Sequence, residues 1–547
     1  MTKFKMLLGL ALISLAFSSN AQAAIGSPDA KQGGTYKYNL SSQPTTLNAL
    51  SSSDVPARQV QDYVMEYLTM QHPDTLETIP ALATKWEVSK DEKTFIFTLR
   101  EGVKWHDGKP LTAEDVKFSF DAIMHPKNKY KTAPKKPYFE NIAGVEILAP
   151  NKVKFSVKKP YFNNFNVVAN GLRIVPKHVY ENPTKKEEKK LNKTLIGTGP
   201  YIFKVMRRGK FIRLVKNEKW WGNSVPEYKG MYNYDNVLLR FVKDSTIALQ
   251  RLEKGDLNFL ELTPEEFVKK TNSSRWGKSV FKVKTTNKAP QGYGFVGWNI
   301  ANPLFASKNV RVALTHLFNR KEMIEKFSYN MSEQATGPLY KTSPYANKSV
   351  KPIDYNPKKA LEILRKEGWK DTDGDMILDK MIDGKKVKFS FTILEPLQDF
   401  VKYLTIFKED AKQAGIDVNI KFIEWNTFVK LLNERKFEAV RLAWGSGSVD
   451  WDPKQIWHSS SIENQGSNFV SYSNPKVDKL IDEARMISDR EKRIQKLNQV
   501  FKLIAEDAPY TFLFNRKYVF YGHTKDLKRP KDSYTYEVGT SYWWLDK

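Results

Sequence analysis

A short apolar run late in the chain ends abruptly in a polar, glycine-rich segment. Ala439 to Trp444 has the length and composition of a buried strand. The segment Gly445-Ser446-Gly447-Ser448 follows it, and then a series of acids and tryptophans. Glycines let a backbone approach a ligand closely, tryptophans offer broad apolar faces, and Asp450 or Asp452 can meet a cation. The pattern predicts either a loop that contacts a ligand or an ordinary exit from a strand.

Strand and helix patterns alternate through the middle of the chain. The apolar run Val237 to Val242 predicts a strand, Thr246 to Glu253 predicts a helix, and Leu257 to Leu260 predicts another strand. Farther toward the N-terminus, Thr94 to Arg100 alternates apolar and polar residues as a half-buried strand does. The alternation predicts a layered α/β fold.

Three helices are predicted from longer patterns. One begins at Thr112, with Asp115 closing a capping box. Val310 to Phe327 and Pro475 to Ala505 each read as one continuous amphipathic helix. The first of these two helices is expected to turn three basic side chains toward solvent: Arg311, His316 and Arg320.

The N-terminal residues have the pattern of an export signal. Lys3 and Lys5 precede the apolar run Met6 to Phe17, and a small-x-small cleavage pattern ends at Ala23. We expect a cleaved signal peptide over residues 1–23 and a periplasmic location. No later segment has the roughly 18 unbroken apolar residues that a membrane-spanning helix needs. With no cysteine, stability must come from ordinary cores, which about 520 residues can build in two or three domains.

The chain is strongly basic, with a formal net charge of +27. Residues 1–23 carry two of these charges and no acid, so the remaining chain keeps a net charge of +25. Such an excess attracts a protein to anionic lipids, cell-wall polymers or acidic ligands. The lysines are dispersed, however, and this favours generic surface charge. We expect no nucleic-acid partner.

One acidic segment has the spacing of a calcium loop. Asp371, Asp373 and Asp375 alternate with other residues, and Asp379 follows four positions later. A standard EF-hand has glycine at its sixth position and glutamate at its twelfth. Here glycine is fourth and Ile382 occupies the twelfth position. The four aspartates therefore predict either bound calcium or a plain acidic turn, and no other cofactor is expected.

Catalytic motifs are missing from the sequence. There is no His-Glu-x-x-His, no Gly-x-Ser-x-Gly, no cysteine and no phosphate-binding Gly-x-x-x-x-Gly-Lys run. His106 beside Asp107 has no nucleophile or metal ligand near it in sequence, so we interpret it as a turn residue. We expect no enzyme activity. An exported cationic cell-wall binder or hydrolase is the alternative from a different class.

Several motifs, in a fixed order along the chain, resemble one known family. Residues 99–116 read Leu-Arg-x-Gly-Val-Lys-Trp-His-Asp-Gly-x-Pro-Leu-Thr-Ala-Glu-Asp-Val. Further matches are Gly197-Thr198-Gly199-Pro200-Tyr201, Asn217-Glu218-Lys219-Trp220-Trp221, Gly297-Trp298-Asn299 and Tyr355-Asn356-Pro357. The chain resembles the family 5 extracellular solute-binding proteins, which are the oligopeptide, dipeptide and nickel receptors of ABC importers. Residues 228–235 are also similar to a subgroup that resembles the Yej microcin and peptide receptor.

The resemblance implies an α/β fold of the type II-like periplasmic-binding-protein kind, with two lobes and an extra domain. Domain I would comprise residues 33–67, 195–285 and 510–547. Domain II would be the extra domain, residues 68–194, and domain III residues 286–509. The family's function implies a monomer that captures peptides or peptide-like solutes between its lobes and delivers them to membrane permease subunits. A non-peptide solute, such as an oligosaccharide, an opine or a metal chelate, is the alternative.

The resemblance also assigns candidate ligand contacts. Trp425 matches a tryptophan that lines the cavity, and Arg441 matches an arginine that approaches a ligand carboxylate. Ala443, Trp444 and Gly445 match the edge that pairs with a peptide backbone. Facing them is the partner loop of the first lobe, with the candidates Ser52, Ser53 and Asp54.

The aspartate that binds the ligand's ammonium group is harder to place. The loop after Trp444 is two residues longer than the family pattern, so Asp450 is the nearest candidate. Asp452 precedes Pro453 and can instead cap a helix.

Overall fold

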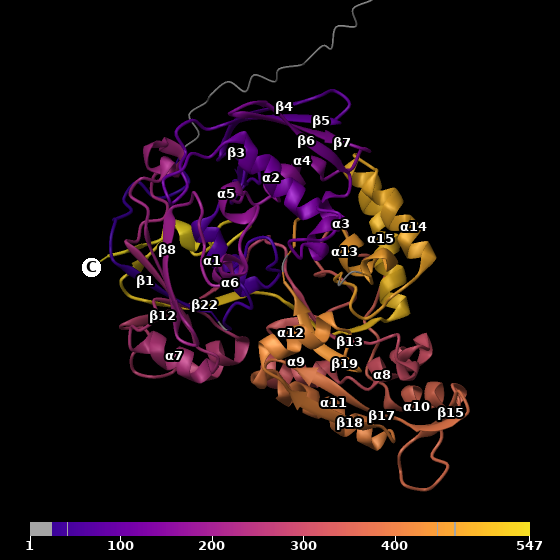
Figure 1. Cartoon of the computed structure of the whole chain (residues 1–547). Coiled ribbons are helices and arrows are strands. Elements are labelled where there is room, and N and C mark those ends of the chain that lie inside the picture. Colours follow the sequence, from indigo (N-terminus) through magenta and orange to yellow (C-terminus); the bar gives the residue numbers. More distant parts are fainter. Residues whose placement is uncertain (1–23, 41, 446, 464–465, 547) are drawn as a thin grey trace, which may run out of the picture.

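The structure is a computed structural model that describes residues 24–40, 42–445, 447–463 and 466–546. Three sheets with their helices make up most of the molecule (Figure 1). The predicted signal peptide lies outside the described residues. Within the described part of the chain, no helix combines the length and the apolar character needed to cross a bilayer.

Lobe 1 is built on a seven-stranded sheet at the left of Figure 1. Its central strand β1 runs parallel to both of its neighbours, β10 and β11. In sheet order the strands are β12 (Val280–Thr285), β22 (Val519–Thr524), β11 (Phe259–Glu261), β1 (Thr35–Leu40), β10 (Asn236–Phe241), β9 (Phe211–Lys216) and β8 (Tyr201–Arg207). Helix α1 (Val55–Val64) contacts β8, and helix α7 (Ser245–Glu253) contacts β11 and β22. The strand and helix predicted between residues 237 and 253 are confirmed.

The extra domain has an antiparallel four-stranded sheet, with the order β4 (Ala83–Val88), β5 (Thr94–Leu99), β7 (Lys152–Val157) and β6 (Ile142–Ala149). Helix α2 (Ala113–Met124) begins at the predicted capping box, in which the Asp115 carboxylate accepts from the Thr112 N–H. Phe118 and Ala122 on α2 belong to the apolar core of lobe 1. The extra domain is therefore fixed to lobe 1. Its shorter helices are α3 (Lys136–Phe139), α4 (Asn164–Ala169), α5 (Lys177–Tyr180) and α6 (Lys185–Leu191).

Lobe 2 contains a five-stranded sheet with the order β18 (Asp417–Phe422), β17 (Ser390–Glu395), β19 (Ala439–Trp444), β13 (Tyr293–Trp298) and β20 (Tyr510–Phe512). Separate apolar cores cover its two faces. The first residues of β19, Ala439 and Val440, are buried on opposite faces, whereas Ala443 near its end is exposed. The helices are α8 (Lys308–His316), α9 (Arg320–Ser328), α10 (Pro357–Lys366), α11 (Val401–Gln413), α12 (Trp425–Asn433), α13 (Lys454–Trp457), α14 (Pro475–Arg485) and α15 (Arg490–Asp507).

Four two-stranded sheets complete the fold. They pair β2 (Thr69–Gln71) with β3 (Thr78–Pro80), β14 (Ser332–Gln334) with β21 (Phe514–Arg516), β15 (Asp379–Ile382) with β16 (Lys385–Lys388), and β23 (Leu527–Lys528) with β24 (Trp544–Leu545). Strand β20 belongs to lobe 2. The chain therefore returns to lobe 1 only after Arg516, later than the predicted boundary at residue 510.

Two of the predicted helices are each two helices. The pattern over 310–327 divides into α8 and α9, because Asn319 caps α9 and accepts from the Glu322 N–H. The pattern over 475–505 divides into α14 and α15, because Asp489 caps α15 and accepts from the Lys492 N–H. In both cases an Asn or Asp N-cap begins a second helix inside a stretch whose amphipathic pattern reads as continuous.

The prediction that Arg311, His316 and Arg320 face solvent is wrong, because all three are buried. Arg311 donates to four main-chain carbonyl oxygens, and Arg320 and His316 also bond to carbonyls. These side chains therefore supply hydrogen-bond donors to main-chain carbonyl oxygens that would otherwise lack a partner in the interior. Burial lowers the pKa of Arg311 to about 10.

Replacing Arg311 by alanine should destabilise the protein by about 4 kcal/mol, because each of four buried carbonyls loses a donor at roughly 1 kcal/mol. Urea unfolding measures this change. The matched control is Arg208→Ala, at an exposed position, which should stay within about 0.5 kcal/mol of the wild type. Equal effects of the two substitutions would contradict the capping role of Arg311.

Candidate functional site

The sheets of the two lobes turn the carboxyl ends of their parallel strands toward each other. In lobe 2, β17 runs parallel to both β18 and β19. In lobe 1, β1 runs parallel to β10 and β11. The carboxyl ends of parallel strands are where open α/β sheets bind ligands. The segments that leave these ends are therefore the candidate walls of a cleft.

Contacts between the lobes join these same segments. Lys243, which follows β10, lies 3.1 Å from the carboxylate of Glu424, which follows β18. Lys402 and Glu265 pair in the same way beyond β17 and β11. A Cβ built on Gly445 would lie 3.8 Å from Cγ2 of Val55, at the start of α1. The glycine-rich segment after β19 thus meets the loop before α1 across the two lobes.

Strand β19 has an open edge on the side of this cleft. Strand β17 pairs with it only through Ile393 and Leu394, and β17 ends at Glu395. If the parallel register continued, the next hydrogen bond would run from the N–H of residue 396 to the Arg441 carbonyl. Residue 396 is proline, which has no N–H to donate. The ladder stops, and the last residues of β19 lose their partner on this side.

The register decides which groups face the open edge. The Gly294 carbonyl of β13 accepts from the Leu513 N–H, on the β20 side. Bonding alternates along an antiparallel pair, so Phe295 faces β19 and pairs with Leu442. Ala443 therefore points its N–H and C=O away from β13, toward the open side, and its side chain is exposed. An extended chain could add there as a further strand.

The partner loop lies opposite and is rigidly built. The Ser52 hydroxyl is buried and accepts from Gln61 Nε2 at 2.8 Å. Asp54 caps α1, accepting from the Ala57 N–H at 2.7 Å, and it also accepts from the Thr45 N–H. Ser53 is exposed. The side chains of Ser52 and Asp54 hold the loop, which leaves Ser53 and the main chain to face the other lobe.

Arg441 is committed to a buried ion pair. Its Nε donates to Glu395 Oε2 at 2.7 Å, and its guanidinium carbon lies 3.5 Å from the ring centre of Phe400. Burial raises the pKa of Glu395, although the charge of Arg441 acts against this. Nη2 of Arg441 is buried and makes no hydrogen bond within the described part of the chain. The pair fixes the end of β17 against β19.

The two predicted tryptophans lie at the rims of these walls, and both are half-buried. Trp444 donates from Nε1 to the Tyr510 hydroxyl at 3.3 Å and stacks on Phe469. Trp425 opens α12, directly after Glu424 of the interlobe ion pair, and stacks on Phe428 with ring centres 6.0 Å apart. Trp425 therefore lies where the cleft meets a contact between lobes.

Asp450 and Asp452 already have partners. Asp450 Oδ1 accepts from the Tyr345 hydroxyl at 2.5 Å and from Arg490 Nε at 3.2 Å. Asp452 accepts from Arg485 Nε at 3.1 Å and from the Lys454 N–H. The second contact of Asp452 is a local turn two residues long, and the N-cap of α13 is Pro453 instead of Asp452. An ammonium ligand at Asp450 would share the carboxylate with these donors.

Sequence reasoning missed the residues that shape the edge. A proline at position 396 indicates the end of a strand, but the sequence does not show which neighbouring strand loses its hydrogen-bond partner there. Gly292 is required because a Cβ there would lie 2.1 Å from the Trp444 carbonyl oxygen. Glu395 follows an apolar strand, and nothing in the sequence shows that it is buried beside Arg441.

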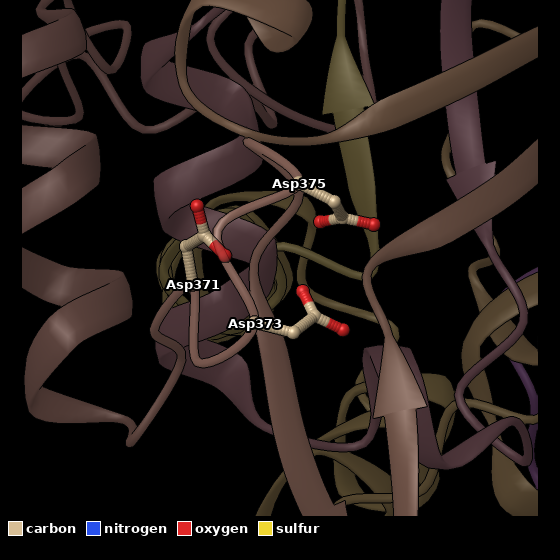
Figure 2. Close-up of side chains that lie close together, drawn as sticks. All are labelled: Asp371, Asp373 and Asp375. Carbon is tan, nitrogen blue, oxygen red and sulfur yellow. The ribbon is translucent and has the colours of Figure 1, made fainter.

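The calcium-loop candidate, residues 371–379, brings three of its four aspartates together. Carboxylate oxygens of Asp371, Asp373 and Asp375 lie within 4.8 Å of one another (Figure 2). Lysines of β16 meet this cluster: Lys386 bonds to Asp373 at 2.9 Å, and Lys388 pairs with Asp375. The hydrogen bond from Lys386 lowers the pKa of Asp373 to about 2.

The fourth aspartate, Asp379, is buried and accepts from the N–H and hydroxyl of Thr372. It braces the turn and does not join the cluster. Calcium binding at this segment stays a prediction.

Because two ammonium groups already offset much of the charge of the three carboxylates, we expect calcium to shift the melting temperature of the wild type by less than about 1 °C. The double variant Lys386→Ala, Lys388→Ala should respond more strongly, since it frees the carboxylates. Thermal unfolding with and without calcium measures both. A clear rise in the wild type that Asp373→Ala removes would contradict this expectation and establish a calcium site.

Known proteins share this architecture. Residues 77–467 match the model of the bacterial extracellular solute-binding proteins, family 5. The oligopeptide-binding protein AppA of Bacillus subtilis is 31% identical over 550 residues, which cover 98% of this chain and 95% of AppA. The dipeptide-binding protein of Escherichia coli is 24% identical over 92% of this chain and 91% of its own length.

Solved structures agree with the fold. The complex of B. subtilis AppA with a nonapeptide superposes with a TM-score of 0.84 at 30% identity, covering 95% of this chain and all of AppA. NikZ from Campylobacter jejuni, in complex with Ni(L-His), reaches 0.78 at 25% identity, covering 93% of this chain and 99% of NikZ. Since the family model spans well over half of the chain and AppA matches nearly all of it, the chain belongs to family 5 of the bacterial extracellular solute-binding proteins.

Proposed function

We propose that this protein is the peptide-binding subunit of an ABC importer. It captures peptides or peptide-like solutes between its lobes and passes them to membrane permease subunits. The observation that carries the proposal is the open edge of β19 at Ala443, two residues before Gly445, which lies against Val55 at the end of the Ser52 to Asp54 loop. An extended peptide satisfies such an edge by strand addition, with main-chain hydrogen bonds supplying affinity and side-chain pockets supplying selectivity.

The relatives support a peptide ligand. AppA is named for oligopeptides and its solved complex holds a nonapeptide. The likeness to AppA extends over nearly the whole of both chains. NikZ shows that a relative can bind a metal chelate. A non-peptide solute therefore remains the alternative that the experiment must distinguish.

The proposal assigns roles to the candidate contacts. Ala443 and Gly445 would offer main-chain groups, and Trp444 and Trp425 would offer apolar rims. On the opposite wall, Ser53 and the backbone of Ser52 and Asp54 would close on the ligand. Nη2 of Arg441 is the buried group available to a ligand carboxylate if the Glu395 pair adjusts.

The wider assignments belong to the same proposal. The protein works as a monomer in the periplasm, reaches it through the signal peptide of residues 1–23, and catalyses no reaction. Solute capture needs only a cleft that opens and closes. The net charge of +25 that remains after residues 1–23 are removed favours encounters with anionic membrane surfaces near a permease.

The direct experiment is mass spectrometry of ligands that copurify with the protein. Recovery of peptides of mixed sequence supports the proposal, because main-chain recognition tolerates varied side chains. Recovery of sugars, opines or metal chelates without peptides overturns it.

The variant Ala443→Pro should weaken peptide binding by about tenfold or more. Proline removes the N–H of residue 443, which points toward the open edge. The hydrogen bonds between β19 and β13 stay in place, because residue 443 makes none of them. Isothermal titration with a copurified peptide measures the loss, and thermal unfolding checks the fold. Ala443→Ser, which keeps the N–H, is the control and should bind normally. Unchanged affinity in the proline variant would contradict the edge-pairing mode.

A further inference from the structure

Each aspartate beyond the glycine-rich segment is held by a buried arginine. Arg485 at the end of α14 donates to Asp452, and the two side chains are 4% and 7% exposed. Arg493 on α15 reaches Asp450 at 3.5 Å and is also 4% exposed. Arg485 is the last residue of α14, and Arg493 is the fourth residue of α15. We call residues 449–452 the acidic segment. Its Trp451 is buried in the core of lobe 2.

The extra domain supplies an aromatic face to each arginine. The guanidinium carbon of Arg485 lies 4.3 Å from the ring centre of Tyr161, and that of Arg493 lies 4.0 Å from the ring centre of Phe162. The Tyr161 hydroxyl also donates to Asp452 Oδ2 at 2.5 Å. Burial, and next the charge of Asp452, raise the pKa of Tyr161, so its hydroxyl keeps the proton that it donates. Tyr161 and Phe162, which are adjacent in sequence, thus complete two stacks, and each stack consists of an aspartate, an arginine and an aromatic ring.

Other contacts lock the same junction. Arg485 donates from Nη2 to the Pro137 carbonyl at 3.1 Å and pairs with Glu140, and its own carbonyl accepts from the Phe162 N–H at 3.1 Å. Lys454 lies 2.8 Å from Glu140. A buried guanidinium needs partners on all sides, since an unpaired buried charge costs several kcal/mol. Removal of one aromatic face should therefore loosen the whole stack.

We propose that Tyr161 and Phe162 are positioning residues that hold the acidic segment, and through it the ligand-binding edge of β19. The inference rests on the proposed function for its effect on ligand. The segment after Gly445 is rich in glycine and serine, so its own preference for one conformation is weak. Its far end must be fixed by contacts. Donors of lobe 2 and the Tyr161 hydroxyl of the extra domain bond to its two aspartates, and the extra domain also stacks on Arg485 and Arg493. The extra domain thereby influences ligand affinity without touching ligand.

This inference gives Asp450 a different role from amine recognition. Its Oδ1 oxygen is shared by Tyr345, Arg490 and Arg493. It anchors the acidic segment, so its loss should weaken binding of peptides with and without a free amine alike. The extra domain is packed on lobe 1, so the two stacks also tie lobe 1 to lobe 2 and should slow ligand release.

Amide hydrogen exchange of the unliganded protein tests the positioning role. Phe162→Leu keeps an apolar side chain but removes the aromatic face, and Tyr161→Phe removes only the hydroxyl. Each should speed exchange of the Lys454 N–H, which donates to the Asp452 carboxylate, by about tenfold or more, and Phe162→Tyr should restore slow exchange. The control Phe97→Leu, in the core of the extra domain, lowers stability and should leave exchange of the Lys454 N–H slow. Unchanged exchange in Phe162→Leu, or equal acceleration in the control, overturns the inference.

Binding of penta-alanine and N-acetyl penta-alanine tests the consequence for ligand. Phe162→Leu and Asp450→Asn should each raise Kd about tenfold for both peptides, chiefly through faster dissociation. A loss confined to the free-amine peptide in Asp450→Asn would overturn the anchoring role of Asp450. If wild-type protein binds neither peptide, the proposed function is in doubt, while the exchange experiment still decides the positioning role.

Discussion

The end of β17 at Pro396 is the constraint on which the ligand cleft depends. A parallel ladder needs an N–H at every second position of each strand, and Pro396 cannot supply one to the Arg441 carbonyl. The buried pair of Glu395 and Arg441 fixes the point where the two strands part. From there β19 continues with one paired edge and one open edge. An open edge inside a protein tends to recruit a strand, and here the strand is proposed to be the ligand.

The rest of the architecture brings a second wall to this edge. Parallel strands in both lobes direct their carboxyl ends to the interface, where Gly445 meets Val55. The interlobe pair of Lys243 with Glu424 is exposed and that of Lys402 with Glu265 is half-buried, so each contributes about 1 kcal/mol. These two pairs therefore oppose opening of the cleft only weakly. Stronger fixation comes from Arg485 and Arg493, which join the extra domain to the segment beyond the edge.

The sequence predicted the strands well where their apolar pattern was complete. Residues 439–444 form β19 as expected, and the capping box at Thr112 starts α2. The pattern failed where a polar residue serves the interior: Arg311 and Arg320 look like a solvent-facing row, yet they cap loop carbonyls supplied by distant residues. The amphipathic pattern also continues across the helix starts at Asn319 and Asp489, so it did not reveal these two N-caps. The neighbours of Asp450 could not be predicted, because Arg493 and Tyr345 reach it only through the tertiary fold.

Main-chain recognition at β19 can be tested most directly with a series of backbone-modified ligands. Penta-alanine would be compared with five analogues, each N-methylated at one residue, and with five analogues that each carry serine in place of one alanine. The account predicts that methylation at one or two positions weakens binding by about 1 to 3 kcal/mol, while every serine analogue binds nearly as well as penta-alanine. Tolerance of methylation at every position, together with large losses on side-chain replacement, would contradict it.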